Sequence, residues 1–159
     1  MPSLARTDLS GPPWEQALIA RFLYGTGMRL LEGLRTRVKD VDVERGQVIV
    51  RGGKGDEDRV TVLPVSLQEK LRAHRERLRR LHAEDRAKGL PGVWLPEGIE
   101  RKWPHAGEQW EWQWVFPSAE LSVDPETKVR RRGRATLRLI ADRRWQIPDW
   151  GCRRWRGRT

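Results

Sequence analysis

Residues 23–67 decide the fold, and their sequence is LYGTGMRLLEGLRTRVKDVDVERGQVIVRGGKGDEDRVTVLPVSL. Within this stretch, residues 47–51 and 59–63 are rich in β-branched side chains, so each segment is expected to form a strand. The loop between them is short and rich in glycine. A loop of this kind predicts an antiparallel hairpin with a mobile tip.

Two helices are expected before this hairpin. Residues 13–24 open with a proline, which suits the first turn of a helix, and continue with apolar side chains at helical spacing. Gly25 and Gly27 are expected to end that helix. Residues 28–34 predict a second, short helix, with Arg29 in its opening turn and its leucines on one face.

A long helix is expected after the hairpin. Ser66 is followed three residues later by Glu69, which is a capping-box pattern for the start of a helix, and Gly89 is a plausible end. One apolar stripe follows from the spacing of Leu67, Leu71, His74, Leu78 and Leu81. Because His74 lies on this stripe, we interpret it as a packed side chain and not as a ligand.

The composition indicates one domain in a reducing compartment. The chain has 159 residues, of which 34% are charged, and its mean hydropathy is -0.76. Cys152 is the single cysteine, so neither an intramolecular disulfide nor a four-cysteine zinc site is possible. No apolar run approaches the roughly 18 residues of a membrane span, and the first residues do not resemble a signal peptide. A cytoplasmic protein without a membrane segment is expected.

The positive charge of the chain is concentrated near its C-terminus. Residues 1–129 hold 21 Lys and Arg against 20 Asp and Glu, whereas residues 130–159 hold 11 Arg against Asp142 and Asp149. An Arg-rich segment with several tryptophans is typical of contacts with nucleic acid. Any such binding is therefore expected to depend on the last 30 residues.

Two positions in residues 23–67 could carry chemistry. Arg29 follows a Gly-Thr-Gly turn, where free backbone N–H groups and a guanidinium together suit a phosphate; an ordinary surface arginine is the alternative. Lys54 lies at the expected hairpin tip, where a flexible ammonium could donate a proton to a leaving oxygen; a solvated turn residue is the alternative. The residues alone leave both pairs of alternatives open.

Residues 23–67 as a whole resemble the catalytic domain of tyrosine recombinases. Residues 93–125, VWLPEGIERKWPHAGEQWEWQWVFPSAELSVDP, are similar to the additional segment that distinguishes integron integrases within that superfamily. The resemblance covers about residues 14–131. It implies an α+β, mainly helical fold with a small antiparallel sheet, in which residues 1–131 are a partial catalytic domain and about residues 90–125 are specific to integron integrases.

The resemblance also implies roles for three residues. Arg29 matches the first catalytic arginine, which contacts the scissile phosphate and stabilises charge on its nonbridging oxygens without a metal or another cofactor. Glu32 matches an acidic residue that supports the active site, with a plain solvated carboxylate as the alternative. Lys54 matches the hairpin lysine that acts as general acid toward the leaving 5' hydroxyl.

The partner that the resemblance implies is DNA, in the form of folded single-stranded cassette sites with extrahelical bases, on which self-association is possible. Trp112 is the candidate for stacking on such a base, and Pro125 matches a proline of a second base pocket. Core packing is the alternative for Trp112. Because Trp110, Trp112 and Trp114 alternate, they are candidates for one face of a strand.

The resemblance ends near residue 131. Residues 132–159 form a basic Arg/Trp-rich tail that is interpreted as frameshifted or disordered, with a genuine binding tail as the alternative. The family's His-x-x-Arg box and nucleophilic tyrosine would lie beyond this point. Tyr24, the single tyrosine, is expected to pack in the core. A truncated, catalytically inactive integron integrase is therefore expected, and a nucleic-acid-binding protein that acts through its tail is the alternative.

Overall fold

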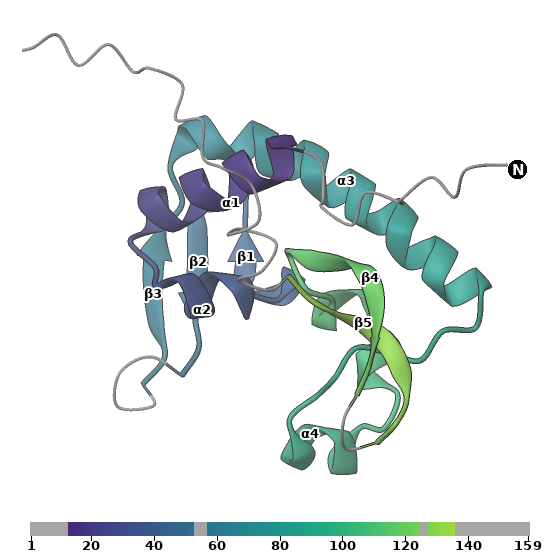
Figure 1. Cartoon of the computed structure of the whole chain (residues 1–159). Coiled ribbons are helices and arrows are strands. Elements are labelled where there is room, and N and C mark those ends of the chain that lie inside the picture. The colour runs from purple at the N-terminus through teal and green to yellow at the C-terminus, as the bar shows by residue number, and fades with distance from the viewer. Residues whose placement is uncertain (1–12, 53–56, 125–126, 136–159) are drawn as a thin grey trace, which may run out of the picture.

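A three-stranded sheet, a long helix and two shorter helices enclose the core (Figure 1). The computed structural model describes residues 13–52, 57–124 and 127–135. The helices are α1 (Pro13–Thr26), α2 (Leu30–Leu34), α3 (Val65–Ala87) and α4 (Glu97–Lys102), with single 3-10 turns at η1 (Val38–Asp40), η2 (Ala106–Glu108) and η3 (Trp110–Trp112). The strands are β1 (Val41–Asp42), β2 (Gln47–Val50), β3 (Arg59–Val62), β4 (Pro117–Val123) and β5 (Arg130–Arg134). The expected α+β class is confirmed.

The predicted hairpin of β2 and β3 is confirmed. The two strands pair antiparallel, with Gln47 opposite Val62 and Val50 opposite Arg59. Strand β1, for which the sequence predicts no element, adds a third strand on the other side of β2. Alternate residues of β2 face the interior, where Val48 and Val50 are fully buried.

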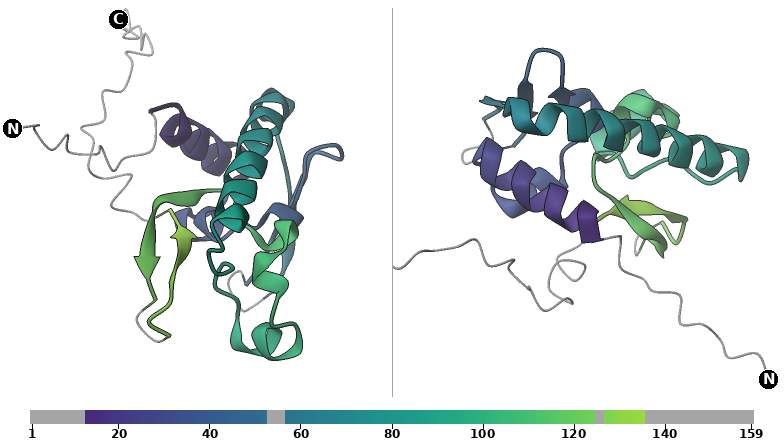
Figure 2. Two further views of the ribbon diagram at one scale, coloured as in Figure 1. Left: turned by 90° about the vertical axis from the view of Figure 1, so that its right-hand side faces the viewer. Right: turned by 90° about the horizontal axis from the view of Figure 1, so that it is seen from above.

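The core lies between this sheet and the helices α1 and α3, which run beside each other in the view from above (Figure 2). Its largest fully buried side chains come from α1, α2, β2, the residue after β3 and the segment before β4: Phe22, Leu34, Val48, Val50, Leu63 and Phe116. The rings of Phe22 and Phe116 meet edge to face, with centroids 5.4 Å apart. This contact joins the start of the chain to the segment before β4.

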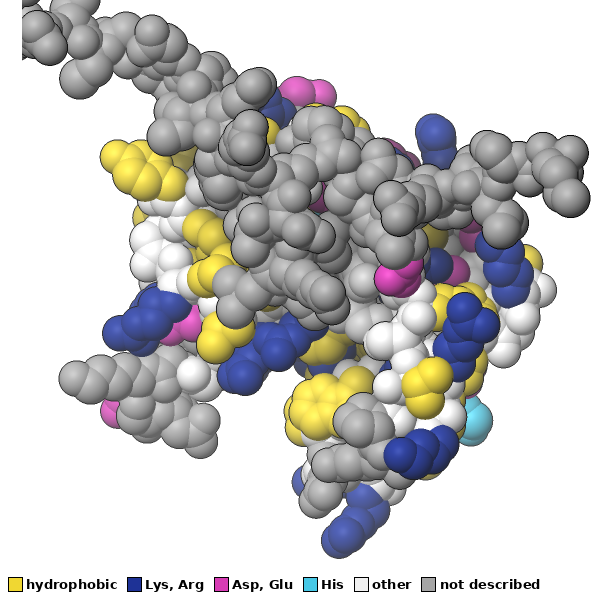
Figure 3. Space-filling view, in the orientation of Figure 1, with side chains coloured by type: hydrophobic (Ala, Val, Ile, Leu, Met, Phe, Trp, Pro, Cys, Tyr) yellow, Lys and Arg dark blue, Asp and Glu magenta, His cyan; other side chains and the backbone are white. Residues whose placement is uncertain are grey.

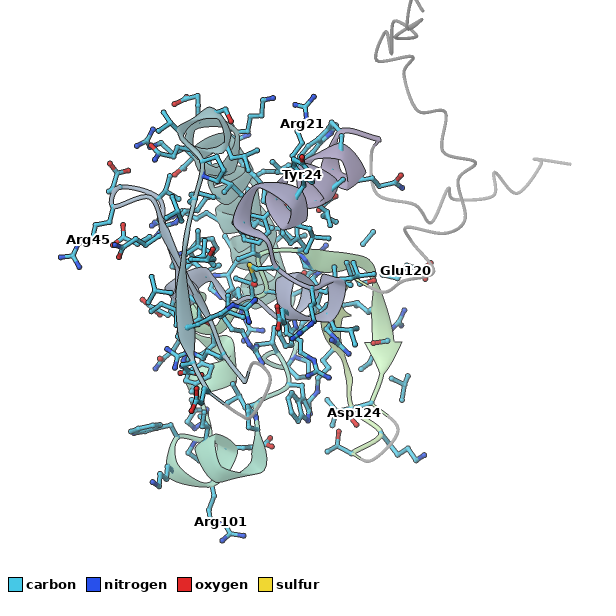
Figure 4. All side chains as sticks on the ribbon, turned by 90° about the vertical axis from the view of Figure 1, so that its left-hand side faces the viewer. Arg21, Tyr24, Arg45, Arg101, Glu120 and Asp124 are labelled. Atoms are coloured by element: carbon cyan, nitrogen blue, oxygen red, sulfur yellow. The ribbon has the colours of Figure 1, made fainter. Side chains whose placement is uncertain are left out.

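Helix α1 is longer than predicted, and one of its side chains is placed differently. The helix continues through Gly25 to Thr26 and ends at Gly27, whose φ of +65° favours glycine. Tyr24 is 93% exposed and projects from the surface of α1 (Figure 4), so the expectation that its ring packs in the core was wrong. In α2, Leu34 is buried but Leu31 is exposed, so the expected leucine face is only partly present.

Helix α3 confirms the predicted stripe but not its predicted cap. Its buried positions include four of the five predicted members of the stripe, namely Leu67, Leu71, His74 and Leu78. The helix begins at Val65 after Pro64, so Ser66 lies inside it and makes no capping hydrogen bond. Beyond the helix, Gly89 has a φ of +65°, as expected for a residue that ends a helix.

The tryptophan-rich segment does not form a strand. Trp110 and Trp112 belong to the 3-10 turn η3, and only Trp114 pairs with another segment, through an isolated antiparallel bridge to Arg37. The backbone around this bridge is held by Val38 N, which donates to Gln113 O, and by Val115 N, which donates to Thr36 O. The three tryptophans therefore do not share the predicted face.

Strands β4 and β5 form a separate two-stranded sheet at the end of the described chain (Figures 1 and 2). Strand β5 extends across residue 131, near which the sequence resemblance was expected to end, and Arg134 pairs with Pro117. Ala135 follows and is buried, and its N–H donates to Phe116 O. Residues 132–135 are thus packed against the rest of the fold.

Candidate nucleic-acid interface

Arg29 and Glu32 are brought together by the first turn of α2. Arg29 precedes the helix in an extended conformation, and its backbone N–H donates to Glu32 Oε2 over 2.9 Å. Its guanidinium Nη1 donates to Glu32 Oε1 over 3.2 Å. The carboxylate therefore holds both the backbone and the side chain of Arg29.

Arg59 completes the cluster from β3. Its Nη1 and Nη2 donate to the two oxygens of Glu32 over 3.2 and 2.8 Å, a bidentate arrangement. Hydrogen bonds from the Arg59 side chain and from the Arg29 backbone lower the pKa of Glu32 to about 2. Glu32 is therefore ionised at neutral pH and links α2 to the hairpin.

The Arg29 guanidinium is oriented but remains accessible. Its side chain is 66% exposed, whereas that of Glu32 is 10% exposed. One part of the guanidinium is thus held by a largely buried carboxylate while much of the side chain faces solvent. An arginine arranged in this way can donate further hydrogen bonds to an oxyanion.

Lys54 lies outside the described residues, but both ends of its loop are held. Before the loop, Arg51 Nε donates over 2.7 Å to the buried Asp40. After the loop, Asp58 accepts from Arg51 Nη1 over 3.0 Å and from the backbone N–H of Gly52 over 3.1 Å. The hairpin therefore presents a closed base to the loop that contains Lys54.

Trp112 is half-buried, and a cation lies over its ring. The ammonium of Lys39 is 3.0 Å from the centroid of the indole. Burial lowers the pKa of Lys39. A cation over an aromatic face is a favourable contact, so Lys39 and a stacked base would compete if they used the same face. Pro125, the other predicted base-contacting residue, lies outside the described residues.

Arg37 is a buried cation that no local sequence pattern singles out. Its guanidinium lies 3.4 Å from the centroid of the Trp114 ring and donates to the carbonyls of Trp112 and Trp94 over 2.7 and 2.8 Å. Burial lowers its pKa to about 10, so it stays charged at neutral pH. Arg37 therefore fixes the tryptophan-rich segment to the start of η1.

His74 and Arg77 have the spacing of a His-x-x-Arg box, but both side chains are engaged elsewhere. His74 Nε2 donates over 2.7 Å to Val115 O, and its ring stacks on Phe116 with centroids 5.5 Å apart. Arg77 pairs with Glu15 over 3.2 Å. This confirms that His74 packs in the core.

Within residues 13–52, 57–124 and 127–135, no group of three or more His, Cys, Asp or Glu side chains is placed to hold an ion. The same part of the chain contains no helix that is both long and apolar enough to cross a membrane.

The fold and the cluster define a small α+β domain in which a carboxylate orients an arginine beside a β-hairpin. The model of the phage integrase family matches residues 5–139. The chain therefore belongs to the phage integrase family and, with it, to the tyrosine recombinase superfamily.

Three relatives agree with this assignment in their amino-acid sequences. Proteins named Integrase/recombinase from Escherichia coli and Pseudomonas aeruginosa are each 50% identical over 118 residues, which is 74% of this chain and 35% of theirs. Tyrosine recombinase XerA of Thermococcus kodakarensis is 46% identical over 59 residues, or 37% of this chain and 21% of that protein. A crystal structure of XerA recombinase covers 44% of this chain and 30% of its own, at 20% identity and a TM-score of 0.30. The chain spans about a third of the length of its first two relatives.

Proposed function

We propose that this chain binds DNA through a backbone phosphate held by Arg29, as part of a site-specific tyrosine recombinase. The observation that carries the proposal is the geometry of Arg29, whose guanidinium is oriented by Glu32 while the side chain is two thirds exposed. Family membership supports it, because residues 5–139 match the phage integrase model. A cytoplasmic site of action follows from DNA as the partner.

Each member of the cluster has a distinct task in this proposal. Arg29 donates to the nonbridging oxygens of the scissile phosphate and stabilises the charge that builds up when phosphorus becomes pentacoordinate. Glu32 acts through Arg29 as a positioning residue, since it holds the backbone and the guanidinium. Lys54 is assigned by resemblance as the donor of a proton to the leaving 5' oxygen.

We further propose that the DNA is a folded single-stranded cassette site, as for an integron integrase. The similarity of residues 93–125 to the segment typical of those enzymes supports this substrate. Trp112 is the proposed stacking platform for an extrahelical base, and Pro125 the proposed contact in a second base pocket. Trp112 is half-buried, so its indole packs partly against the fold and leaves part of its surface exposed for a base.

The 159-residue chain is proposed to bind DNA without cutting it. Its single tyrosine is Tyr24, which lies on the exposed surface of α1 and matches no nucleophile motif. Groups that act as a unit lose nearly all activity when one of them is missing. We therefore assign to this chain the phosphate-binding part of the reaction.

The test combines binding with a trap for cleavage. The chain is incubated with a cassette hairpin that carries a nick to trap a cleaved product, and a denaturant-resistant complex is sought. The expected result is reversible binding that weakens in Arg29→Gln, with no covalent complex. A covalent complex would contradict the proposed inactivity, and binding unaffected by Arg29→Gln would contradict the phosphate site.

A second candidate function is binding through the C-terminal tail. Residues 136–159 lie outside the described residues and hold seven Arg against Asp142 and Asp149. Each phosphate neutralised on duplex DNA contributes about 0.9 to the slope of log affinity against log salt. If the tail supplies the binding, deletion of residues 136–159 removes most of that slope. If the Arg29 cluster supplies the binding, Arg29→Gln lowers the slope both in the full chain and in the chain without residues 136–159.

A further inference from the structure

Two arginines from separate elements, Arg35 and Arg134, lie near the end of α2 that is opposite to Arg29. Arg35 directly follows α2, and Arg134 is the last residue of β5. The backbone next to each arginine is bonded to the same segment, because Val115 N donates to the carbonyl of Thr36 and Ala135 N donates to the carbonyl of Phe116. The segments that carry the two arginines are therefore held against neighbouring residues of one strand-like segment.

No carboxylate of the described chain neutralises this pair. The described arginines that do have carboxylate partners are Arg29, Arg45, Arg51, Arg59, Arg72, Arg77, Arg86, Arg131 and Arg132. Arg134 instead has a buried Nη1 without a hydrogen-bond partner among the described residues. Burial lowers the pKa of Arg134, and the positive charge of Arg35 lowers it further. An unpaired, partly desolvated donor next to a like charge favours the binding of an anion.

The position of the pair suits a phosphate chain that already contacts Arg29. Arg29 and Arg35 lie at opposite ends of α2, six residues apart, which corresponds to about 9 Å along a helix axis. One strand of DNA rises about 3.4 Å per nucleotide, so the two ends of α2 are separated by the rise of two or three nucleotides. Basic side chains are gathered around α2 on the face shown in Figure 3.

We propose that Arg35 and Arg134 form a second phosphate-binding position, which holds a DNA backbone phosphate two or three nucleotides from the one at Arg29. This inference rests on the proposed function, since it takes DNA as the partner. The two guanidiniums donate to the phosphate oxygens together, and the phosphate removes the repulsion between them. Arg134 thereby gives β5 a direct part in DNA binding.

The test measures the salt dependence of hairpin DNA binding by the full chain. The variants are Arg35→Gln, Arg134→Gln and the double variant, each with a melting curve. Arg101→Gln is the matched control, because Arg101 is exposed on α4 at the opposite end of the molecule from α1 (Figure 4). The expected result is a decrease of about 0.7 to 0.9 in the magnitude of the log–log slope, nearly equal in both single variants and the double variant.

A charge-preserving variant separates binding from folding. Arg35→Lys with Arg134→Lys should keep the slope of the original chain, although the affinity falls severalfold because lysine lacks the planar donor fork. A lowered melting temperature combined with a lost slope in this variant would overturn the proposal. So would slopes in the three glutamine variants equal to that of Arg101→Gln.

Two further outcomes distinguish this inference from the proposed function. If Arg29→Gln lowers the slope but Arg35→Gln and Arg134→Gln do not, the second position is rejected and the proposed function stands. If the unmodified chain does not bind the hairpin, both are rejected. The last measurement uses inorganic phosphate as the probe. If it raises the melting temperature of the unmodified chain but not that of the double variant, while both proteins show the same salt slope with DNA, the pair binds small anions. The assignment to DNA is then overturned.

Discussion

Arg132 on β5 and Asp85 near the end of α3 form a bidentate ion pair. Arg132 Nε and Nη2 donate to the two carboxylate oxygens of Asp85 over 2.6 and 2.8 Å, and the two side chains are 13% and 10% exposed. The remaining nitrogen, Nη1, donates to the carbonyls of Ser118 and Ala119 on β4. One guanidinium therefore ties both strands of the second sheet to the long helix.

Asp85→Ala is expected to destabilise the fold strongly. Removal of one partner of a largely buried ion pair leaves a charge without compensation and costs about 3 to 5 kcal/mol. The measurement is the free energy of unfolding in urea at pH 7. Glu84→Ala, at the exposed neighbouring position, is the control and should change it by less than about 0.5 kcal/mol. Similar values for the two variants would show that the pair contributes little.

Acid should weaken the cluster around Glu32 within a defined pH range. The pKa of Glu32 is about 2 in the fold and 4.5 in its ordinary state, so its interactions stabilise the protein fully above about pH 4.5. This contribution is lost as the pH falls toward 2, where the carboxylate takes up a proton. Glu32→Gln should therefore be less stable at pH 6 and show a flatter decline of the melting temperature between pH 4.5 and 2. Parallel curves for the two proteins would contradict the low pKa.

His74 should add a separate loss of stability on acidification, which begins at a higher pH than the loss caused by Glu32. Burial lowers its pKa to about 4 from an ordinary value of 6.5, although the hydrogen bond to Val115 raises it in part. Because the fold favours the neutral ring, stability is fully present above about pH 6.5 and declines as the pH falls toward 4. His74→Gln should remove the decline in this interval. An NMR titration that places the His74 pKa near 6.5 would refute the prediction.

Trp112→Ala separates base stacking from core packing. If Trp112 stacks on an extrahelical base, the variant should bind a hairpin with such bases about 1 to 3 kcal/mol more weakly and bind fully paired DNA almost normally. If Trp112 is instead a core residue, unfolding becomes easier by about 3 to 5 kcal/mol and both DNAs lose affinity alike. Melting curves beside the two binding curves decide between these outcomes.

Lys39→Met tests the cation over the Trp112 ring. Because the ammonium lies 3.0 Å from the ring centroid, a base that uses the same face has to displace it. The variant should lose affinity for both DNAs through the lost charge, but the preference for the hairpin over the duplex should increase. An unchanged preference would indicate that the base uses the other face or that Trp112 does not stack.

Local patterns predicted the elements that form the core, because those patterns reflect burial. The β-branched segments around residues 48 and 60 predicted the hairpin, and the spacing from Leu67 to Leu78 predicted the buried side of α3. The prediction that Tyr24 packs in the core was wrong, because an aromatic ring in a largely apolar helix does not show which side of the helix faces solvent.

Other parts of the fold depend on contacts between distant residues. Arg37 is buried because its guanidinium stacks on the Trp114 ring and donates to two carbonyls more than 50 positions away. No local sequence pattern predicts these contacts. Strand β5 has the sequence RRRGR, which has low strand propensity, and it is held by β4 and Asp85. The Arg29–Glu32 contact was accessible from the sequence as an i, i+3 pair, whereas Arg59 joins only through the pairing of β2 and β3.

The burial of Ala135 sets the shortest chain on which the tail can be tested. Ala135 donates its N–H to Phe116, whose ring lies at the centre of the core, and the three residues before it carry the end of β5. A protein cut at residue 131 would lose the guanidinium that joins β4 to α3 together with the donor at Phe116, so it would report on unfolding and not on the tail. A stop codon placed after residue 135 removes the basic extension and keeps the whole of β5, Arg132 and the donor at Phe116.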